Sequence, residues 1–257
     1  MIRRLLVMIG LFACGAPAIA MVGGAAESEG AGAGRHAVLI VGSRGTSCTG
    51  VAVARDLILT AAHCLHAGAD YRLVEFDARH SPTLKNIVSV TRHPQFDMAT
   101  FLAHRATADV ALIKLAEPLA PAVEVAPLAA SGRRVAVGDR LTVAGYGVAV
   151  RGDGRTGGTA RVAVLAVTGR PGNLQIRLID PDTLGARAGL GACSGDSGAP
   201  AFDAANDRFA IVGVVSWSTG PNDTAGCGGL TGVTPLSFYR DWIVQTARRL
   251  GSPLPPS

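Results

Sequence analysis

Short apolar runs, rich in valine, isoleucine and leucine and separated by turn residues, recur along almost the whole chain. Their apolar cores fit strands, which are about 4–8 residues long, better than helices, which usually exceed about 10. Such runs without helical stretches between them predict an all-β barrel or sandwich. They occupy residues 37–43, 49–64, 71–76, 86–93, 109–115, 140–147, 160–167, 174–180 and 209–217.

One segment near the C-terminus, residues 235–251, has a helical pattern instead. Arginines occupy its last predicted turn, and Gly251 follows as a stop signal. The side chains that fall near one helix face are Phe238, Trp242, Ile243 and Leu250. We therefore expect a single C-terminal helix that packs on the β-structure.

The first twenty residues resemble an export signal. A basic start, MIRR, precedes a short apolar core and the small residues APAIA. The apolar core is too short to span a bilayer, and no later stretch approaches the required length. This predicts a signal peptide over residues 1–20, a secreted or periplasmic protein, and no membrane association after cleavage. A strand or helix inside the fold, lipid attachment at Cys14, and cleavage after Ala18 are the alternatives.

Removal of this segment changes the charge and the cysteine count. The formal charge falls from +5 to +3, because Arg3 and Arg4 leave without an acidic residue. No cluster of basic residues interleaved with aromatic residues remains, so no nucleic-acid partner is predicted. Cys14 also leaves, and an even number of cysteines in an exported protein implies two disulfides with three possible pairings. The remaining cysteines are Cys48, Cys64, Cys193 and Cys227.

Three stretches carry residues suited to nucleophilic catalysis. LTAAHCL contains His63, TADVALIKL contains Asp109, and GACSGDSGAP contains Ser197. Serine is a weak nucleophile unless a base takes its proton, and histidine is the commonest such base. Each stretch alone has an ordinary structural explanation, but their combination favours a serine hydrolase. The other histidines have no partners at metal-ligand spacing, and no metal or cofactor is predicted.

The motifs TAAHC, DVALIKL, AGYG, GDSGAP and VVSW resemble those of trypsin/chymotrypsin-like serine proteases, in the same order. The likeness runs from Met21 to about Leu250. It implies two six-stranded antiparallel β-barrels, with the active site between them and an α-helix at the C-terminus. One protease domain would span residues 21–257, with the barrel boundary at roughly 125–140. The resemblance also implies the disulfide pairs Cys48–Cys64 and Cys193–Cys227.

The resemblance further implies a mechanism. His63 would be the general base, Asp109 would orient it, and Ser197 would attack the substrate. The backbone N–H groups of Gly195 and Ser197 would form the oxyanion hole. The chain would then be a secreted, monomeric serine endopeptidase that forms an acyl-enzyme. Its partners would be protein or peptide substrates and a protein inhibitor.

Two further sets of residues follow from the same resemblance. Cleavage after Ala20 would free the amine of Met21, and this amine would pair with Asp196. No separate activation peptide would then be needed. The primary pocket has Gly191 at its floor, where an acidic residue would select arginine or lysine, and is therefore expected to favour apolar side chains of medium to large size. The predicted substrate-binding residues are Gly191, Ala192, Ser216, Trp217, Ser218 and Gly232.

The sequence argues against two other classes of protein. An α/β-hydrolase esterase needs G-x-S-x-G, with the serine before the histidine in the chain. Here Ala199 stands where the last glycine would be, and His63 precedes Ser197. A catalytically inactive binding protein on the same fold is the second alternative, since a fold alone does not establish activity. The intact set of three residues argues against it.

Overall fold

The strands form two closed antiparallel barrels. The computed structural model describes residues 21–26, 32–77, 79, 81–205 and 208–255, so the predicted signal peptide lies outside the described residues. The first barrel follows the order β2-β3-β4-β7-β6-β5. Its strands are β2 (Ala37–Gly42), β3 (Ser47–Ala54), β4 (Leu57–Thr60), β5 (Tyr71–Phe76), β6 (Pro82–Arg92) and β7 (Ala111–Leu115).

The second barrel begins after a long connection that follows β7. Its strands run in the order β9-β10-β13-β12-β11-β8, and the pairing of β8 with β9 closes it. A short strand, β1 (Ala25–Ala26), pairs antiparallel with the start of β9. The barrel strands are β8 (Arg140–Gly145), β9 (Arg161–Gly169), β10 (Ile176–Ile179), β11 (Pro200–Ala205), β12 (Arg208–Ser218) and β13 (Thr231–Pro235). The expected pair of six-stranded barrels is thereby confirmed.

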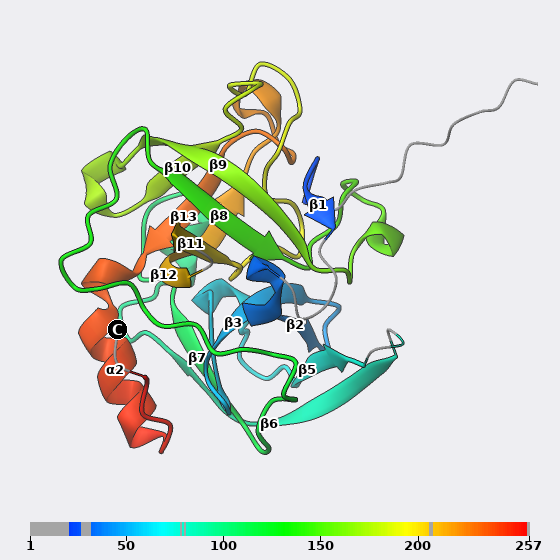
Figure 1. The fold of residues 1–257 in the computed structure, drawn as a ribbon, viewed down its shortest axis with the longest axis vertical. Helices are drawn as coiled ribbons and strands as arrows, with labels where there is room; N and C mark the ends of the chain where they lie inside the picture. Colours follow the sequence, from blue (N-terminus) through cyan, green and yellow to red (C-terminus); the bar gives the residue numbers. More distant parts are fainter. Residues whose placement is uncertain (1–20, 27–31, 78, 80, 206–207, 256–257) are drawn as a thin grey trace, which may run out of the picture.

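Helices are few and short. The α-helices are α1 (Met98–Leu102) and α2 (Arg240–Arg249), and α2 lies against β7 (Figure 1). Ile243 and Ala247 of α2 are buried, whereas Phe238 is 57% exposed because it lies in the turn before the helix. Short 3₁₀ helices are η1 (Ala33–His36), η2 (Ala62–Cys64), η3 (Gly154–Thr156), η4 (Pro171–Asn173), η5 (Pro221–Asp223) and η6 (Leu236–Phe238). Within the described residues, no helix has the length and apolarity needed to cross a membrane.

Each barrel has its own apolar core, and a third core joins the barrels. This joint core contains Leu39 and Val51 from the first barrel, Phe202 and Val214 from the second, and Ile243 from α2. Apolar burial at this junction fixes the barrels relative to one another, because each buried aliphatic side chain contributes about 1.5–3 kcal/mol. The loops at the junction therefore begin and end on strands whose relative positions are fixed.

Candidate active site

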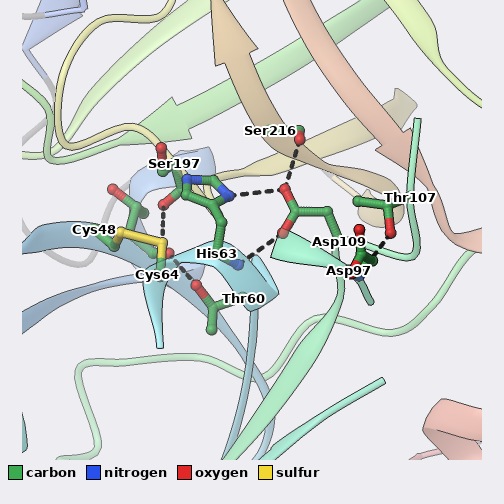
Figure 2. A network of polar contacts seen from close by, with 10 residues as sticks. Cys48, Thr60, His63, Cys64, Asp97, Thr107, Asp109, Ser197 and Ser216 are labelled. Carbon is green, nitrogen blue, oxygen red and sulfur yellow. Dashed lines mark hydrogen bonds and ion pairs between the residues drawn. A yellow bond between two sulfur atoms is a disulfide. The ribbon is translucent and has the colours of Figure 1, made fainter. Parts of the chain in front are cut away.

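The junction brings together the three residues that the motifs singled out. His63 lies in η2, directly after β4, and Asp109 lies just before β7. Because β4 pairs with β7 in the first barrel, these two residues become neighbours. Ser197 comes from the loop that precedes β11 of the second barrel. Figure 2 shows Ser197 beside the His63 ring, on the side away from Asp109.

The carboxylate of Asp109 fixes the histidine. It is 1% exposed, and its Oδ1 accepts the backbone N–H of His63 at 2.8 Å. Its Oδ2 lies 2.8 Å from Nδ1 of His63 and accepts the Ser216 hydroxyl at 2.5 Å. Since Nδ1 faces a carboxylate, the proton of the neutral ring belongs on Nδ1, which leaves the lone pair on Nε2. The imidazole is therefore oriented as a base toward Ser197.

In the loop from Cys193 to Gly198, the N–H groups of Ser194, Gly195 and Ser197 donate no hydrogen bond among the described residues. The Ser194 carbonyl accepts the Val148 N–H at 2.8 Å, and the Asp196 carbonyl accepts the Ala199 N–H at 2.9 Å. In a planar trans peptide the N–H points opposite to the C=O. The N–H groups of Gly195 and Ser197 consequently point the other way, and neither has an acceptor in the described part of the chain.

Glycine is needed at two positions of this loop. Gly195 has a φ of +95°, and an added Cβ would lie 2.9 Å from the Cα of Gly147. Gly198 has a φ of +81°, and a Cβ there would overlap the carbonyl oxygen of Thr49. Side chains are therefore excluded by the backbone conformation and by close neighbours, which come from the second barrel at Gly195 and from the first barrel at Gly198.

Comparison with known proteins agrees with this geometry. Residues 21–243 match the sequence profile of the trypsin family. The chain belongs to the trypsin family. It is 29% identical over 216 residues to the vitellin-degrading protease of Bombyx mori, a match that covers 79% of this chain and 77% of that protein. It is 28% identical over 216 residues to a trypsin of Phaedon cochleariae, covering 76% and 77%.

Solved structures agree on the fold of this trypsin-family chain. A structure titled as the atomic-resolution structure of HBP superposes with a TM-score of 0.69 at 25% identity, covering 91% of this chain and all of that one. The disulfides Cys48–Cys64 and Cys193–Cys227 are both formed, which confirms the predicted pairing. The first links β3 to η2, and the second links the Ser197 loop to the loop before β13. His63 lies near the first disulfide, but disulfide sulfurs are not thiolates and offer no metal site.

A cleft of about 700 Å³ runs between the barrels beside Asp109. Three of the predicted substrate-binding residues line it, namely Ser216, Trp217 and Ser218. Gly191 and Ala192 are buried behind it, and the indole of Trp217 covers Gly232. Thr231 stands outside the predicted site residues, yet it is fully buried and its hydroxyl accepts the Ala192 N–H at 2.9 Å.

Phe101 of α1 is a second residue that the motifs did not indicate. Its ring stacks on the His63 ring, with 4.4 Å between centroids and 11° between planes. Asp97 begins α1 by accepting the Thr100 N–H at 2.6 Å, so this short helix is held in place beside the histidine. One face of the imidazole is thereby covered by an aromatic ring from the chain itself.

Asp196 is buried among backbone groups next to the nucleophile. It is 0% exposed, and its oxygens accept the N–H groups of Gly147 at 2.8 Å and Cys193 at 2.9 Å. Burial raises its pKa to about 7, although the two N–H groups and the charge of Arg161 act in the opposite direction. The ionised form of Asp196 is therefore costly in the full chain.

This burial predicts an unusual pH dependence of stability. The unfolded chain releases the Asp196 proton near its ordinary pKa, whereas the folded chain keeps it until about pH 7. Stability that is present below about pH 4 is therefore lost as the pH rises toward 7, by on the order of 4 kcal/mol from this group. Thermal unfolding of the full chain and of Asp196→Asn, at pH 4.5 and pH 7.5, measures the effect. The aspartate form should lose more stability over this interval, and equal losses would contradict the prediction.

Proposed function

We propose that the chain is a serine endopeptidase that hydrolyses peptide bonds through an acyl-enzyme. The observation that carries this proposal is the hydrogen-bonded set of Ser216, Asp109 and His63, with Ser197 at the open end of the imidazole. Ser197 Oγ attacks the carbonyl carbon while Nε2 of His63 takes its proton. The proton then passes to the leaving amine as the C–N bond breaks, and water repeats the sequence to release the acid.

The free N–H groups of Gly195 and Ser197 would stabilise the negative charge that develops on the carbonyl oxygen. Donors that are already oriented cost no reorganisation during the reaction, and losing one such donor typically lowers the rate about 10²- to 10³-fold. Their orientation rests on Val148 and Thr49, because Thr49 Oγ1 donates to the Gly195 carbonyl at 2.8 Å. The first barrel thus supports the oxyanion hole of the second.

We infer an uncharged and short primary pocket that takes small apolar side chains, in place of the medium to large ones expected from the sequence. Gly191 carries no charge, and an added Cβ there would lie 3.1 Å from the Cα of Gly228. Thr231 is buried and its Oγ1 accepts the Ala192 N–H at 2.9 Å, and we infer that its side chain limits the depth of the pocket. At the entrance, the Ser218 hydroxyl reaches the Gly226 carbonyl at 3.4 Å.

Shortening Thr231 should change the size preference of this pocket. Thr231→Gly is expected to raise kcat/KM for substrates with leucine or phenylalanine at the cleaved bond about tenfold or more relative to alanine. Thr231→Val is the matched control, because it keeps the volume and loses the hydrogen bond to Ala192. A peptide library measures both variants. If Thr231→Val changes the preference as much as Thr231→Gly, the pocket does not end at this side chain.

Activation would follow from export of the protein. Cleavage after Ala20 would free the amine of Met21, which would pair with buried Asp196. Two observations support this: Met21 is fully buried, and Val22 forms an antiparallel bridge with Gly191 beside the Ser197 loop. Sequencing the N-terminus of the exported protein tests it, since an active enzyme that starts at Ile19 would contradict activation by this amine. Secretion, a monomeric state and recognition by a protein inhibitor belong to the same proposal.

A fluorophosphonate probe tests the proposed function directly. The exported protein should be labelled at Ser197 and should cleave a peptide library. The alternative is an inactive binding protein, and a solved structure titled human heparin binding protein has this fold at 24% identity. Absence of both labelling and cleavage in the folded, processed protein would favour that alternative.

A further inference from the structure

Arg161 is a buried cation that the catalytic mechanism above does not use. It is 8% exposed, and its Nε is buried with no hydrogen-bond partner among the residues that the structure describes. Within the described part of the chain, its Nη1 donates two long hydrogen bonds, both at 3.4 Å, to the carbonyls of Thr156 and Thr159. Burying a guanidinium with so few acceptors is unfavourable unless a negative charge lies nearby.

The strand register indicates where that negative charge lies. Arg161 on β9 is directly opposite Gly145 on β8, and cross-strand partners project their side chains from the same face. Gly145 has no side chain, and a Cβ built there would overlap the carboxylate of Asp196. The Asp196 carboxylate therefore occupies the space beside Arg161, and the two charges interact electrostatically.

Asp196 needs a positive charge to stay ionised while buried. Its hydrogen bonds from Gly147 and Cys193 are stronger when it is ionised, and they hold the loop that contains Gly195 and Ser197. In the full chain the Met21 nitrogen is part of a peptide bond and carries no charge. Among the described residues, Arg161 is the charged side chain that acts on Asp196.

We propose that Arg161 is a positioning residue that acts as a resident counter-charge for Asp196 and keeps the oxyanion hole assembled before the Met21 amine is free. This rests on the protease function proposed above. The two cations differ in titration: an α-amine has a pKa of about 7.7–8, whereas arginine loses its proton only at much higher pH, even though burial lowers the pKa of Arg161. The unprocessed chain would therefore be partly active, and its activity would survive at alkaline pH.

The test compares two N-termini in the presence and absence of Arg161. One form begins at Met21, and the other retains Ile19 and Ala20 ahead of it. Arg161→Gln should lower kcat/KM of the extended form by about 10²-fold or more, the loss typical of a disordered oxyanion hole. In the form that begins at Met21, the same substitution should cost less than about tenfold at pH 7.5 but should produce a new loss of activity above about pH 9.

Two further variants separate charge from packing. Arg161→Lys should restore the extended form at pH 8 and lose activity as the pH passes about 10, where lysine deprotonates. Arg140→Gln, an exposed arginine on neighbouring β8, should leave both forms unchanged. Equal losses in both forms with unaltered pH profiles would overturn the proposal, as would full activity of the extended Arg161→Gln form.

A measurement without catalysis keeps this inference separate from the protease proposal. In extended chains that all carry Ser197→Ala, Arg161→Gln and Asp196→Asn are made singly and together. The double substitution should lower Tm by less than the sum of the single effects, because each removes the partner of the other. Additive losses of Tm would overturn the proposed interaction of Arg161 with Asp196. A failure of fluorophosphonate labelling in the chain that keeps Ser197 would overturn the protease function alone.

Discussion

Replacing Ser197 with alanine is expected to lower kcat for peptide hydrolysis by about 10⁶-fold, the loss found when a triad nucleophile is removed. Ser197 is the only member of the set that can form the covalent intermediate, since His63 and Asp109 already bond to each other. The fold should survive the change, because among the described residues Ser197 is held by its backbone carbonyl, which accepts the Thr49 N–H at 2.8 Å. Initial rates on a fluorogenic peptide measure the loss.

Ser194 offers a matched control three residues away. It is exposed, and its carbonyl bonds to the Val148 N–H, while its side chain has no role in the proposed chemistry. Ser194→Ala should keep both fluorophosphonate labelling and hydrolysis within a few-fold of the parent protein. If Ser197→Ala retained more than about 1% of the parent activity in a preparation free of other proteases, another nucleophile would have to be sought.

The sequence predicted most of the strands but missed two that complete the second barrel. β11 begins with Pro200 and continues through alanines, and β13 contains Gly232 and ends at Pro235. β11 has no β-branched residue, and the glycine and proline of β13 interrupt its β-branched ones, so neither strand is easily identified from sequence. Both form because β12 lies between them and pairs with each. Their strand conformation is therefore set by tertiary pairing and not by local propensity.

The residues proposed to carry the chemistry were easier to predict than the residues that contact and position them. His63, Asp109 and Ser197 stand in motifs with a recognisable order, and the confirmed disulfides follow from the same family resemblance. Thr231 and Phe101 carry no such signal, because their contacts with Ala192 and His63 appear only when distant segments meet. Arg161 is hidden for the same reason: only the pairing of β8 with β9 places it beside Asp196.

Replacing Asp109 with asparagine tests how the carboxylate controls the imidazole. The backbone N–H of His63 donates to Oδ1 and cannot change, so the asparagine oxygen must stay at that position. The amide NH₂ then takes the place of Oδ2, where it faces Nδ1 of His63. The asparagine NH₂ and the Nδ1–H of His63 are both donors and cannot hydrogen-bond to each other. The ring therefore shifts its proton from Nδ1 to Nε2, so that Nδ1 can accept. In that tautomer His63 has no lone pair for the Ser197 proton.

The expected result is a fall in kcat of about 10⁴-fold near neutral pH, the magnitude associated with this tautomer change in Ser-His-Asp triads. Ser216→Ala provides a milder comparison, because it removes one neutral donor at 2.5 Å from Oδ2 of Asp109 and leaves the carboxylate in place. It should lower kcat about tenfold. Thermal unfolding should remain cooperative in both variants, which separates the chemical effect from misfolding. A loss for Asp109→Asn no greater than that for Ser216→Ala would mean that the carboxylate does not set the tautomer of His63.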